Sequence, residues 1–127
     1  MATVDITAET FEETIEKNDI VVVDFWAEWC GPCKSFAPIY EEVSNDEDYD
    51  GVDIVFGKID TEAEQELGAH FQIRSIPTLM IFREQVVLFS QAGMLNNTQL
   101  KEVIAKVQEL DMKEVHAEIA KGEQQAG

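Results

Sequence analysis

The segment that most constrains the fold is Ile20–Trp26, a run of seven residues that is apolar except for Asp24. β-Branched and aromatic side chains fill it without the alternation of a half-exposed strand, which is typical of a strand buried on both faces. Such a strand needs a covering layer on either side, so the run predicts the central strand of a sheet between helices. It is far shorter than the roughly 20 residues that span a bilayer.

The patterns around this run alternate between strands and helices. We expect strands at residues 3–6, 20–26, 52–59, 78–82 and 86–90, and helices at 8–17, from the cysteines to about 44, at 62–71 and through 100–107. Residues 83–85 have the length of a hairpin connection, and Asn97 or Thr98 is expected to cap the last helix. The order β α β α β α β β α predicts an α/β domain with a central mixed sheet, helices on both faces and an antiparallel hairpin at the end.

Length and composition fit one domain followed by a short extension. The chain has 127 residues, of which 45% are hydrophobic, enough for a core without disulfide staples. We assign residues 1–110 to the domain and 111–127 to a C-terminal extension. Its apolar residues recur at helical spacing and predict a short helix from Asp111 to about Gly122, docked on the body, before a disordered end.

The charge balance excludes several classes of partner. Against 9 Lys and Arg stand 26 Asp and Glu, a net charge of −17. Such a surface repels phosphate backbones and anionic lipid heads, so we expect no nucleic-acid or membrane partner. We interpret the acids as the solvated face of a soluble protein, with adaptation to salt as an alternative. Residues 45–53, with five acids, are expected to form an exposed loop without a specific role. The first twenty residues lack the apolar run of a secretory signal, which favours a cytoplasmic protein.

The two cysteines, Cys30 and Cys33, point to redox chemistry. A disulfide between residues this close in sequence constrains little of the unfolded chain, so a purely structural role is not expected. A structural zinc site needs four ligands, and His70 and His116 are single and distant in sequence, so a zinc site is not expected either. At the first turn of a helix, free backbone N–H groups and the helix dipole favour a thiolate, so Cys30 is expected to be the nucleophile. Cys33, one turn deeper and more buried, is placed to attack a mixed disulfide on Cys30.

The two residues between the cysteines are expected to shape the turn. Gly31 allows the turn to be tight, while Pro32 fixes its backbone. Neither adds charge. An imidazolium between the cysteines would stabilise the thiolate and thereby the reduced form, as an oxidant requires, so Gly31 and Pro32 favour a reductant over an oxidant or isomerase. A binding subunit that uses the fold only as a scaffold is the third possibility.

The segment DFWAEWCGPCK, residues 24–34, resembles the signature stretch of the thioredoxin family. The resemblance extends to Lys58–Asp60, to Arg74–Thr78 and to Gly93, and it covers roughly residues 3–108. It implies the thioredoxin fold and a monomeric dithiol carrier that reduces protein disulfides without a bound cofactor or metal. A flavoprotein thioredoxin reductase would then supply the electrons.

The resemblance also implies roles for buried polar residues. Asp24 matches the aspartate that accepts the proton of the second cysteine, and Lys58 would be its charge partner. Burial in mid-strand would raise the pKa of Asp24 well above about 4. The alternatives are an Asp24 near water at a strand end and a merely solvated Lys58.

The same resemblance implies a surface that contacts substrates around Cys30. Pro77 would follow a cis peptide bond, and the backbone of Ile76 would pair with an extended substrate segment. Trp29, Ile76, Pro77 and Gly93 would form a flat apolar patch, with core packing as the alternative for Trp29. Three basic residues are expected near this patch and predict a locally less negative face for docking: Lys34, Lys58 and Arg74.

Overall fold

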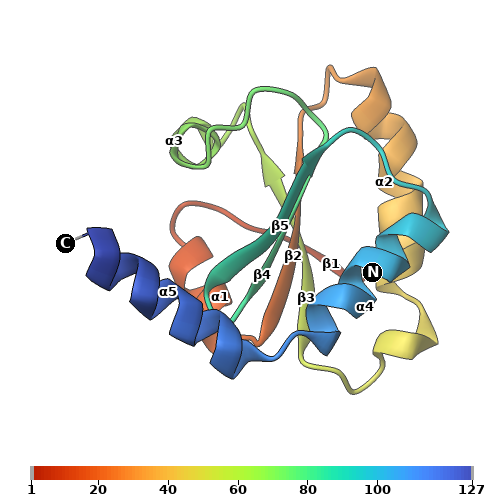
Figure 1. The fold of residues 1–127 in the computed structure, drawn as a ribbon. Coiled ribbons are helices and arrows are strands. Elements are labelled where there is room, and N and C mark those ends of the chain that lie inside the picture. Colours follow the sequence, from red (N-terminus) through yellow and green to blue (C-terminus); the bar gives the residue numbers. More distant parts are fainter. Residues whose placement is uncertain (1, 127) are drawn as a thin grey trace.

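The structure is a computed structural model, and it describes residues 2–126. Its elements follow the expected order, including the helix of the C-terminal extension, with one short 3₁₀ helix in addition (Figure 1). The strands are β1 (Thr3–Asp5), β2 (Ile20–Trp26), β3 (Ile54–Asp60), β4 (Thr78–Arg83) and β5 (Val86–Ala92). The helices are α1 (Phe11–Lys17), α2 (Gly31–Ser44), the 3₁₀ helix η1 (Glu47–Tyr49), α3 (Gln65–His70), α4 (Asn97–Glu109) and α5 (Met112–Ala126).

The strands form one mixed sheet in the order β1-β3-β2-β4-β5. β3 pairs in parallel with β1 and β2, whereas β4 pairs antiparallel with β2 and β5. Six of the seven residues of β2 are buried, which confirms the central strand and the antiparallel hairpin predicted from the sequence.

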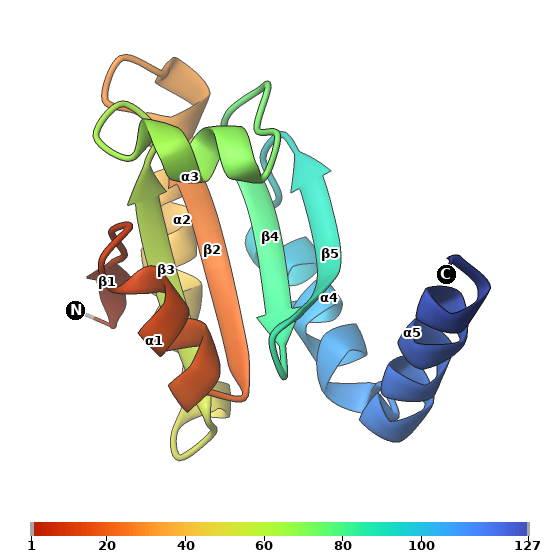
Figure 2. The same ribbon diagram turned by 90° about the vertical axis from the view of Figure 1, so that its left-hand side faces the viewer.

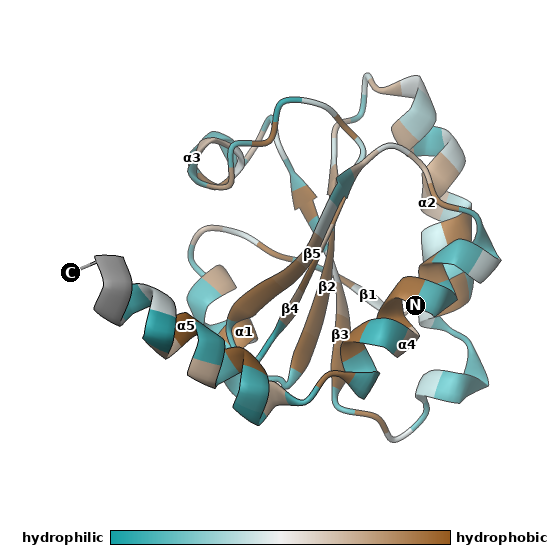
Figure 3. Cartoon of the chain, in the orientation of Figure 1, coloured by the Kyte–Doolittle hydropathy of each residue, from teal (hydrophilic) through white to brown (hydrophobic). Residues whose placement is uncertain are grey.

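Helices cover both faces of the sheet. Figure 2 shows α1 and α3 in front of the strands and α2 and α4 behind them. Each pair buries its apolar side chains against one face, and brown, apolar colour fills the strands between them in Figure 3. The core on the α2 and α4 side includes Val22, Phe36, Tyr40, Leu100 and Ile104, and the core on the other side includes Val21, Val23, Phe25, Ile59 and Met80.

The starts of two helices differ from the prediction. α1 begins at Phe11 instead of residue 8, after a turn in which Phe11 N donates to Thr7 O. α4 is capped by Asn96, so the prediction of Asn97 or Thr98 was wrong: Asn96 Oδ1 accepts a bond from Gln99 N at 2.8 Å, and the Gln99 side chain bonds Asn96 N in return.

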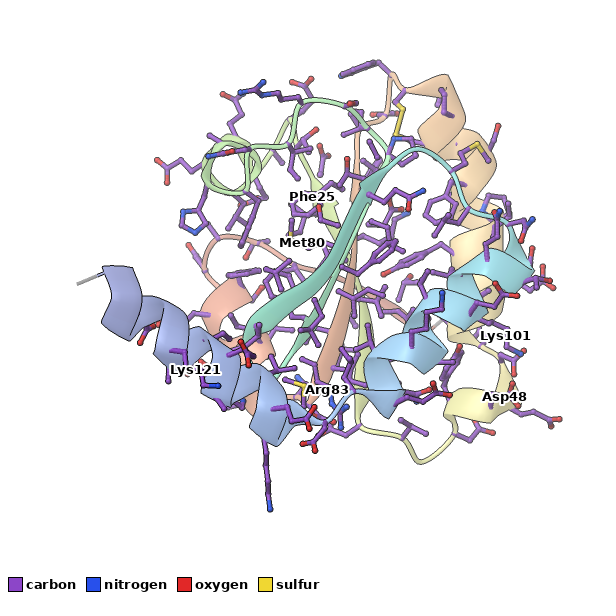
Figure 4. The ribbon with its side chains drawn as sticks, viewed as in Figure 1. Phe25, Asp48, Met80, Arg83, Lys101 and Lys121 are labelled. Atoms are coloured by element: carbon purple, nitrogen blue, oxygen red, sulfur yellow. A yellow bond between two sulfur atoms is a disulfide. The ribbon has the colours of Figure 1, made fainter. Side chains whose placement is uncertain are left out.

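The sequence suggested that the acidic segment 45–53 has no specific role, but the structure gives it one. It contains η1, and Lys101 of α4 pairs with two of its acids, Asp46 at 2.9 Å and Asp48 at 2.7 Å. Lys101 and Asp48 meet at the junction of α4 and η1 in Figure 4. These ion pairs join the segment to the last helix of the domain.

The C-terminal extension is a longer helix than predicted. α5 begins where expected, since Asp111 Oδ1 accepts from Lys113 N at 3.0 Å. It continues through Gly122 to Ala126, so the expected end near Gly122 was wrong, and Gly127 lies outside the described residues. Buried Met112 and a 2.9 Å hydrogen bond between His116 Nε2 and Glu84 Oε1 hold α5 to the body. Beyond β5 the helix points away from the domain (Figure 2).

Candidate active site

The two cysteines lie where β2 passes into α2, and they form a disulfide. Cys30 is the N-cap of α2, Gly31 and Pro32 make its first turn, and the Cα atoms of Cys30 and Cys33 are 5.2 Å apart. The Cys33 N–H donates to Cys30 Sγ at 3.2 Å, as expected for a sulfur at a helix N-terminus. Figure 4 shows the yellow disulfide at this end of α2. The expected difference in burial is not visible in this form, since the exposed fractions are 4% for Cys30 and 3% for Cys33.

A cis peptide bond lies directly beside the disulfide. Ile76–Pro77 is cis, as the resemblance implied, and the Ile76 carbonyl oxygen lies 3.6 Å from Cys30 Sγ. Gly93 N donates to Pro77 O at 2.8 Å, and Gly93 has a φ of 101°, which glycine adopts without strain. Within the described residues the Ile76 N–H has no hydrogen-bond partner. The structure therefore brings Ile76, Pro77 and Gly93 to the cysteines.

Trp29 is a surface residue next to Cys30. Its side chain is 68% exposed, so core packing is excluded, and its Nε1 donates to Glu62 Oε1 at 2.6 Å. The ring separates two surface hollows. One is lined by Glu28, Trp29, Lys34, Asp60 and Glu62, and the other includes Trp29, Glu62, Ile73, Arg74 and Ile76.

These hollows correct the expectation of a less negative face. Lys34 and Arg74 do lie on either side of Trp29, but three carboxylates line the same surface: Glu28, Asp60 and Glu62. The prediction counted the basic residues of three segments without the acids beside them, which come from the loop before α2, the end of β3 and the loop after β3. The pairing of Trp29 with Glu62 was missed because it joins segments 33 residues apart.

Asp24 lies inside the sheet layer and not near water. Its side chain is fully buried, and within the described residues neither carboxyl oxygen has a hydrogen-bond partner. Burial raises the pKa of Asp24 from 3.8 to about 7, and the Lys58 charge opposes this shift only in part. A carboxyl group with such a pKa can both hold and release a proton near neutral pH.

Lys58 lies in register with Asp24, but it does not form an ion pair with it among the described residues. Its Nζ is instead 4.8 Å from the centroid of the Trp26 ring. That ring also packs against Cys30 and Cys33, and its buried Nε1 has no partner in the described chain. Sequence reasoning missed Trp26, although its position two residues after Asp24 puts it on the same face of β2.

Tyr40 is a second buried polar residue that the sequence analysis did not single out. Its hydroxyl lies 2.8 Å from Gly57 O and 3.0 Å from Val22 O, and thus fastens α2 to both β2 and β3. Burial raises the pKa of Tyr40 well above its ordinary value, and the negative charge of Asp24 adds to the shift. Its spacing of seven residues from Cys33 on α2 was the available signal.

The described residues offer no metal site or membrane span. They contain no cluster of three or more His, Cys, Asp or Glu side chains suited to a metal ion. None of the helices within residues 2–126 combines the length and hydropathy that crossing a bilayer requires.

A disulfide at the N-terminus of a helix, facing a cis-proline that directly precedes the neighbouring strand β4, defines a protein of the thiol–disulfide exchange class. The family model for thioredoxin matches residues 2–106. The chain is 50% identical to the Streptomyces coelicolor protein named "Putative thioredoxin 2", over 99% of this chain and 91% of that one. It is 40% identical to thioredoxin from Staphylococcus haemolyticus, over 84% of this chain and 98% of that one.

The fold agrees with these relatives. A mutant thioredoxin from Halobacterium salinarum superposes with a TM-score of 0.75 at 28% identity, covering 86% of this chain and 93% of the other. The chain belongs to the thioredoxin family. It is a thiol–disulfide oxidoreductase of the protein-disulfide reductase type, with Cys30–Cys33 as its redox-active disulfide.

Proposed function

We propose that this protein is a general reductant of protein disulfides in which Cys30 attacks and Cys33 resolves. The observation that carries the proposal is the disulfide at the start of α2, with Cys30 Sγ 3.6 Å from the Ile76 carbonyl oxygen. Cys30 is the residue next to this surface loop and to exposed Trp29, whereas Cys33 lies inside the first turn of α2. An incoming disulfide therefore meets Cys30 first.

Substrates dock across the surface around Cys30. The free N–H and the carbonyl group of Ile76 give an extended segment of a substrate two backbone partners. Trp29, Pro77 and Gly93 supply the flat surface beside it. Recognition through backbone atoms tolerates many sequences, which suits a carrier that acts on many disulfide-containing proteins.

The exchange proceeds in two balanced steps. The Cys30 thiolate attacks one sulfur of the substrate disulfide, forms a mixed disulfide and releases the first substrate thiolate, which takes up a proton. Cys33 then loses its proton to Asp24, attacks Cys30 Sγ and releases the second substrate thiolate. The substrate gains two electrons and the protein is left as the Cys30–Cys33 disulfide. The positive charge of Lys58 assists the proton transfer by stabilising ionised Asp24.

Asp24→Asn tests the proton acceptor. The amide cannot accept the proton of Cys33, so the second step slows at pH 7 and mixed disulfides persist, whereas attack by Cys30 continues. Rapid acid quenching and mass spectrometry measure the trapped fraction. Normal rates in Asp24→Asn from pH 6 to pH 8 would remove Asp24 from the mechanism.

The partners and location follow from the same proposal. A flavoprotein thioredoxin reductase regenerates the dithiol, and the protein works as a cytoplasmic monomer. No bound cofactor is required, because the electrons reside on Cys30 and Cys33. Turnover with a purified reductase of this class, and a monomeric mass in sedimentation, are the results expected.

The reduction potential of the Cys30–Cys33 pair, measured in defined thiol buffers by tryptophan fluorescence, tests the direction of the reaction. Thioredoxin lies at about −270 mV and the strongest oxidants of this class at about −120 mV. A value near or below about −250 mV is expected, and one above about −200 mV would make the protein an oxidant or isomerase.

The two cysteine variants test the roles of the sulfurs. Cys30→Ser should abolish insulin reduction, and Cys33→Ser should accumulate stable mixed disulfides with substrates. A protein that keeps its cellular role with both cysteines replaced by serine would be a binding scaffold instead of a reductant.

A further inference from the structure

Lys58 has three carboxylates near it in the sheet, yet its ammonium lies over an aromatic ring. Register places Asp5 of β1 on one side of Lys58 and Asp24 of β2 on the other, and Asp60 is two residues along β3 on the same face. Among the described residues Lys58 forms an ion pair with none of them. Its Nζ lies instead 4.8 Å from the Trp26 ring centroid, within the range of a cation–π interaction.

The position of Lys58 leaves Asp24 without any partner. Both carboxyl oxygens are buried and unbonded within the described residues. A neutral carboxyl group can remain so at moderate cost, but a buried carboxylate without a partner is far less stable. Among the described residues that pair with Asp24 in the sheet, Lys58 on the adjacent strand β3 is the only cation. When Asp24 ionises, its carboxylate therefore competes with the Trp26 ring for the Lys58 ammonium. Neutral Asp24 does not compete in this way.

We propose that Trp26 is a positioning residue that holds the Lys58 ammonium over its ring, away from neutral Asp24, and yields it when Asp24 ionises. The balance between ring and carboxylate then sets how readily Asp24 accepts a proton. Because the same ring packs against Cys30 and Cys33, the holding site for the lysine is part of the redox centre. The functional consequence rests on the proposed role of Asp24 as proton acceptor, but the movement of Lys58 does not.

Further groups around Asp24 come from α2 and β4. α2 contributes Tyr40, whose pKa is raised well above its ordinary value by burial, and Cys33, which is held in the disulfide. β4 opposes Asp24 with Leu79, which carries no charge. The charged groups to observe in the oxidised protein are thus Asp24 and Lys58, with Asp5 on β1 beyond Lys58 and Asp60 two residues along β3.

The first test is a carboxyl ¹³C NMR titration of Asp24 in the oxidised full-length protein. Trp26→Leu removes the ring, so Lys58 becomes available to Asp24 and the Asp24 midpoint should fall by about half a pKa unit or more. Lys58→Met should raise the midpoint. In the Lys58→Met background, Trp26→Leu should have no further downward effect.

The comparison of Trp26→Leu with and without Lys58 distinguishes an effect of the lysine from simple entry of water. If loss of the ring acted only by admitting water, the Asp24 midpoint would fall whether or not Lys58 is present. An equal effect of Trp26→Leu in both backgrounds, or an upward shift with Lys58 present, overturns the proposal. Trp29→Leu is the matched control: its ring is 68% exposed and bonds Glu62, so the Asp24 midpoint should not change.

A second test needs no substitution. In the unmodified protein the ε-methylene protons of Lys58 should be shifted upfield by the Trp26 ring at low pH. This shift should diminish as pH rises, with the same midpoint as the Asp24 carboxyl signal. An unshifted resonance, or a shift that stays constant through the Asp24 midpoint, overturns the proposal even if the Trp26 variant does not fold. Both tests use the disulfide form without substrate, so their failure leaves disulfide reduction standing, and loss of reductase activity leaves them unaffected.

Discussion

At the scale of single residues, Asp24 opposes the stability of the fold at neutral pH. Its pKa is raised to about 7 by burial, so the folded protein keeps this proton between about pH 4 and pH 7, where the unfolded chain has lost it. For a carboxyl group with a raised pKa, the contribution to stability is complete below pH 4 and is lost as pH rises through 7. The difference of about three units corresponds to about 4 kcal/mol in the free energy of unfolding.

Asp24→Asn should therefore stabilise the oxidised protein at pH 8 by up to about 4 kcal/mol and change little at pH 4. Urea unfolding at both pH values measures the difference. Asp50→Asn, at an exposed residue without a pairing cation, is the control and should give no such pH-dependent gain. An equal gain from Asp24→Asn at pH 4 and pH 8 would indicate better packing instead of removal of a buried charge.

The functional residues that lie together in one short segment could be predicted from the sequence. Cys30, Cys33 and Asp24 all belong to the strand-to-helix segment. The type and spacing of the two cysteines indicate a nucleophile and a resolving thiol, whereas the role of Asp24 followed only from the family resemblance. The contacts of Lys58 and Trp29 could not be predicted, because they depend on which rotamer each takes between neighbouring strands and helices. The Lys58 ammonium lies over the Trp26 ring and not beside a carboxylate, and Trp29 Nε1 donates a hydrogen bond to Glu62, which is distant in sequence.

At the scale of elements, the existence of each strand and helix could be predicted more readily than its ends. Periodicity identifies the buried face over many residues, whereas a boundary depends on one capping group. Asn96, Asn97 and Thr98 are all acceptable caps by type. Only the extended backbone of Asn96, with ψ of 174°, turns its side chain onto the free N–H groups of α4.

Asn96→Ala should lower the free energy of unfolding by about 1 kcal/mol, because Gln99 N loses its acceptor and the reciprocal bond of the capping box is lost. Urea unfolding of the oxidised protein measures this change. Asn97→Ala is the control, since the Asn97 side chain makes no capping bond within the described residues. Equal losses in the two variants would show that the capping box contributes nothing of its own.

The C-terminal helix shows why a glycine is a weak stop signal. Gly122 costs a helix interior roughly 1 kcal/mol relative to alanine, but it ends a helix only where it takes a positive φ. Gly51 and Gly93 have positive φ values, and Gly122 does not. The helix therefore passes through it, and composition alone could not distinguish the two behaviours.

At the scale of the whole molecule, the reactive site and the C-terminal extension lie at opposite ends of the sheet. Antiparallel pairing sets Phe25 of β2 beside Thr78, at the end that carries the cysteines, and Ile20 beside Arg83 at the other. α5 attaches at the latter end through Glu84, in the turn after β4. The topology could be predicted because alternating strands and helices admit few arrangements, whereas the direction of α5 depends on a few side-chain contacts.

The net charge of −17 should determine how the stability of this molecule depends on salt. Because 26 acids stand against 9 basic residues, most carboxylates have no cation to pair with, and only a few exposed ion pairs oppose the repulsion among them. Salt screens both, but repulsion predominates by number, so Tm should rise as NaCl increases from about 0.02 M to about 1 M, where the Debye length falls to about 3 Å. The rise should be several degrees, since at this size about 1 kcal/mol corresponds to about 4 °C.

Neutralising exposed acids should reproduce the effect of salt. A variant with four exposed, unpaired acids changed to amides should have a higher Tm in low salt and a smaller gain from added NaCl: Glu42→Gln, Asp50→Asn, Glu102→Gln and Glu109→Gln. Calorimetry of both proteins in the two salts provides the comparison. If surface ion pairs governed stability instead, NaCl would lower Tm in both proteins, because screening weakens attraction as it weakens repulsion. A Tm that falls with salt would thus assign the dominant role to pairs such as Lys101 with Asp46 and Asp48, and not to the acidic surface as a whole.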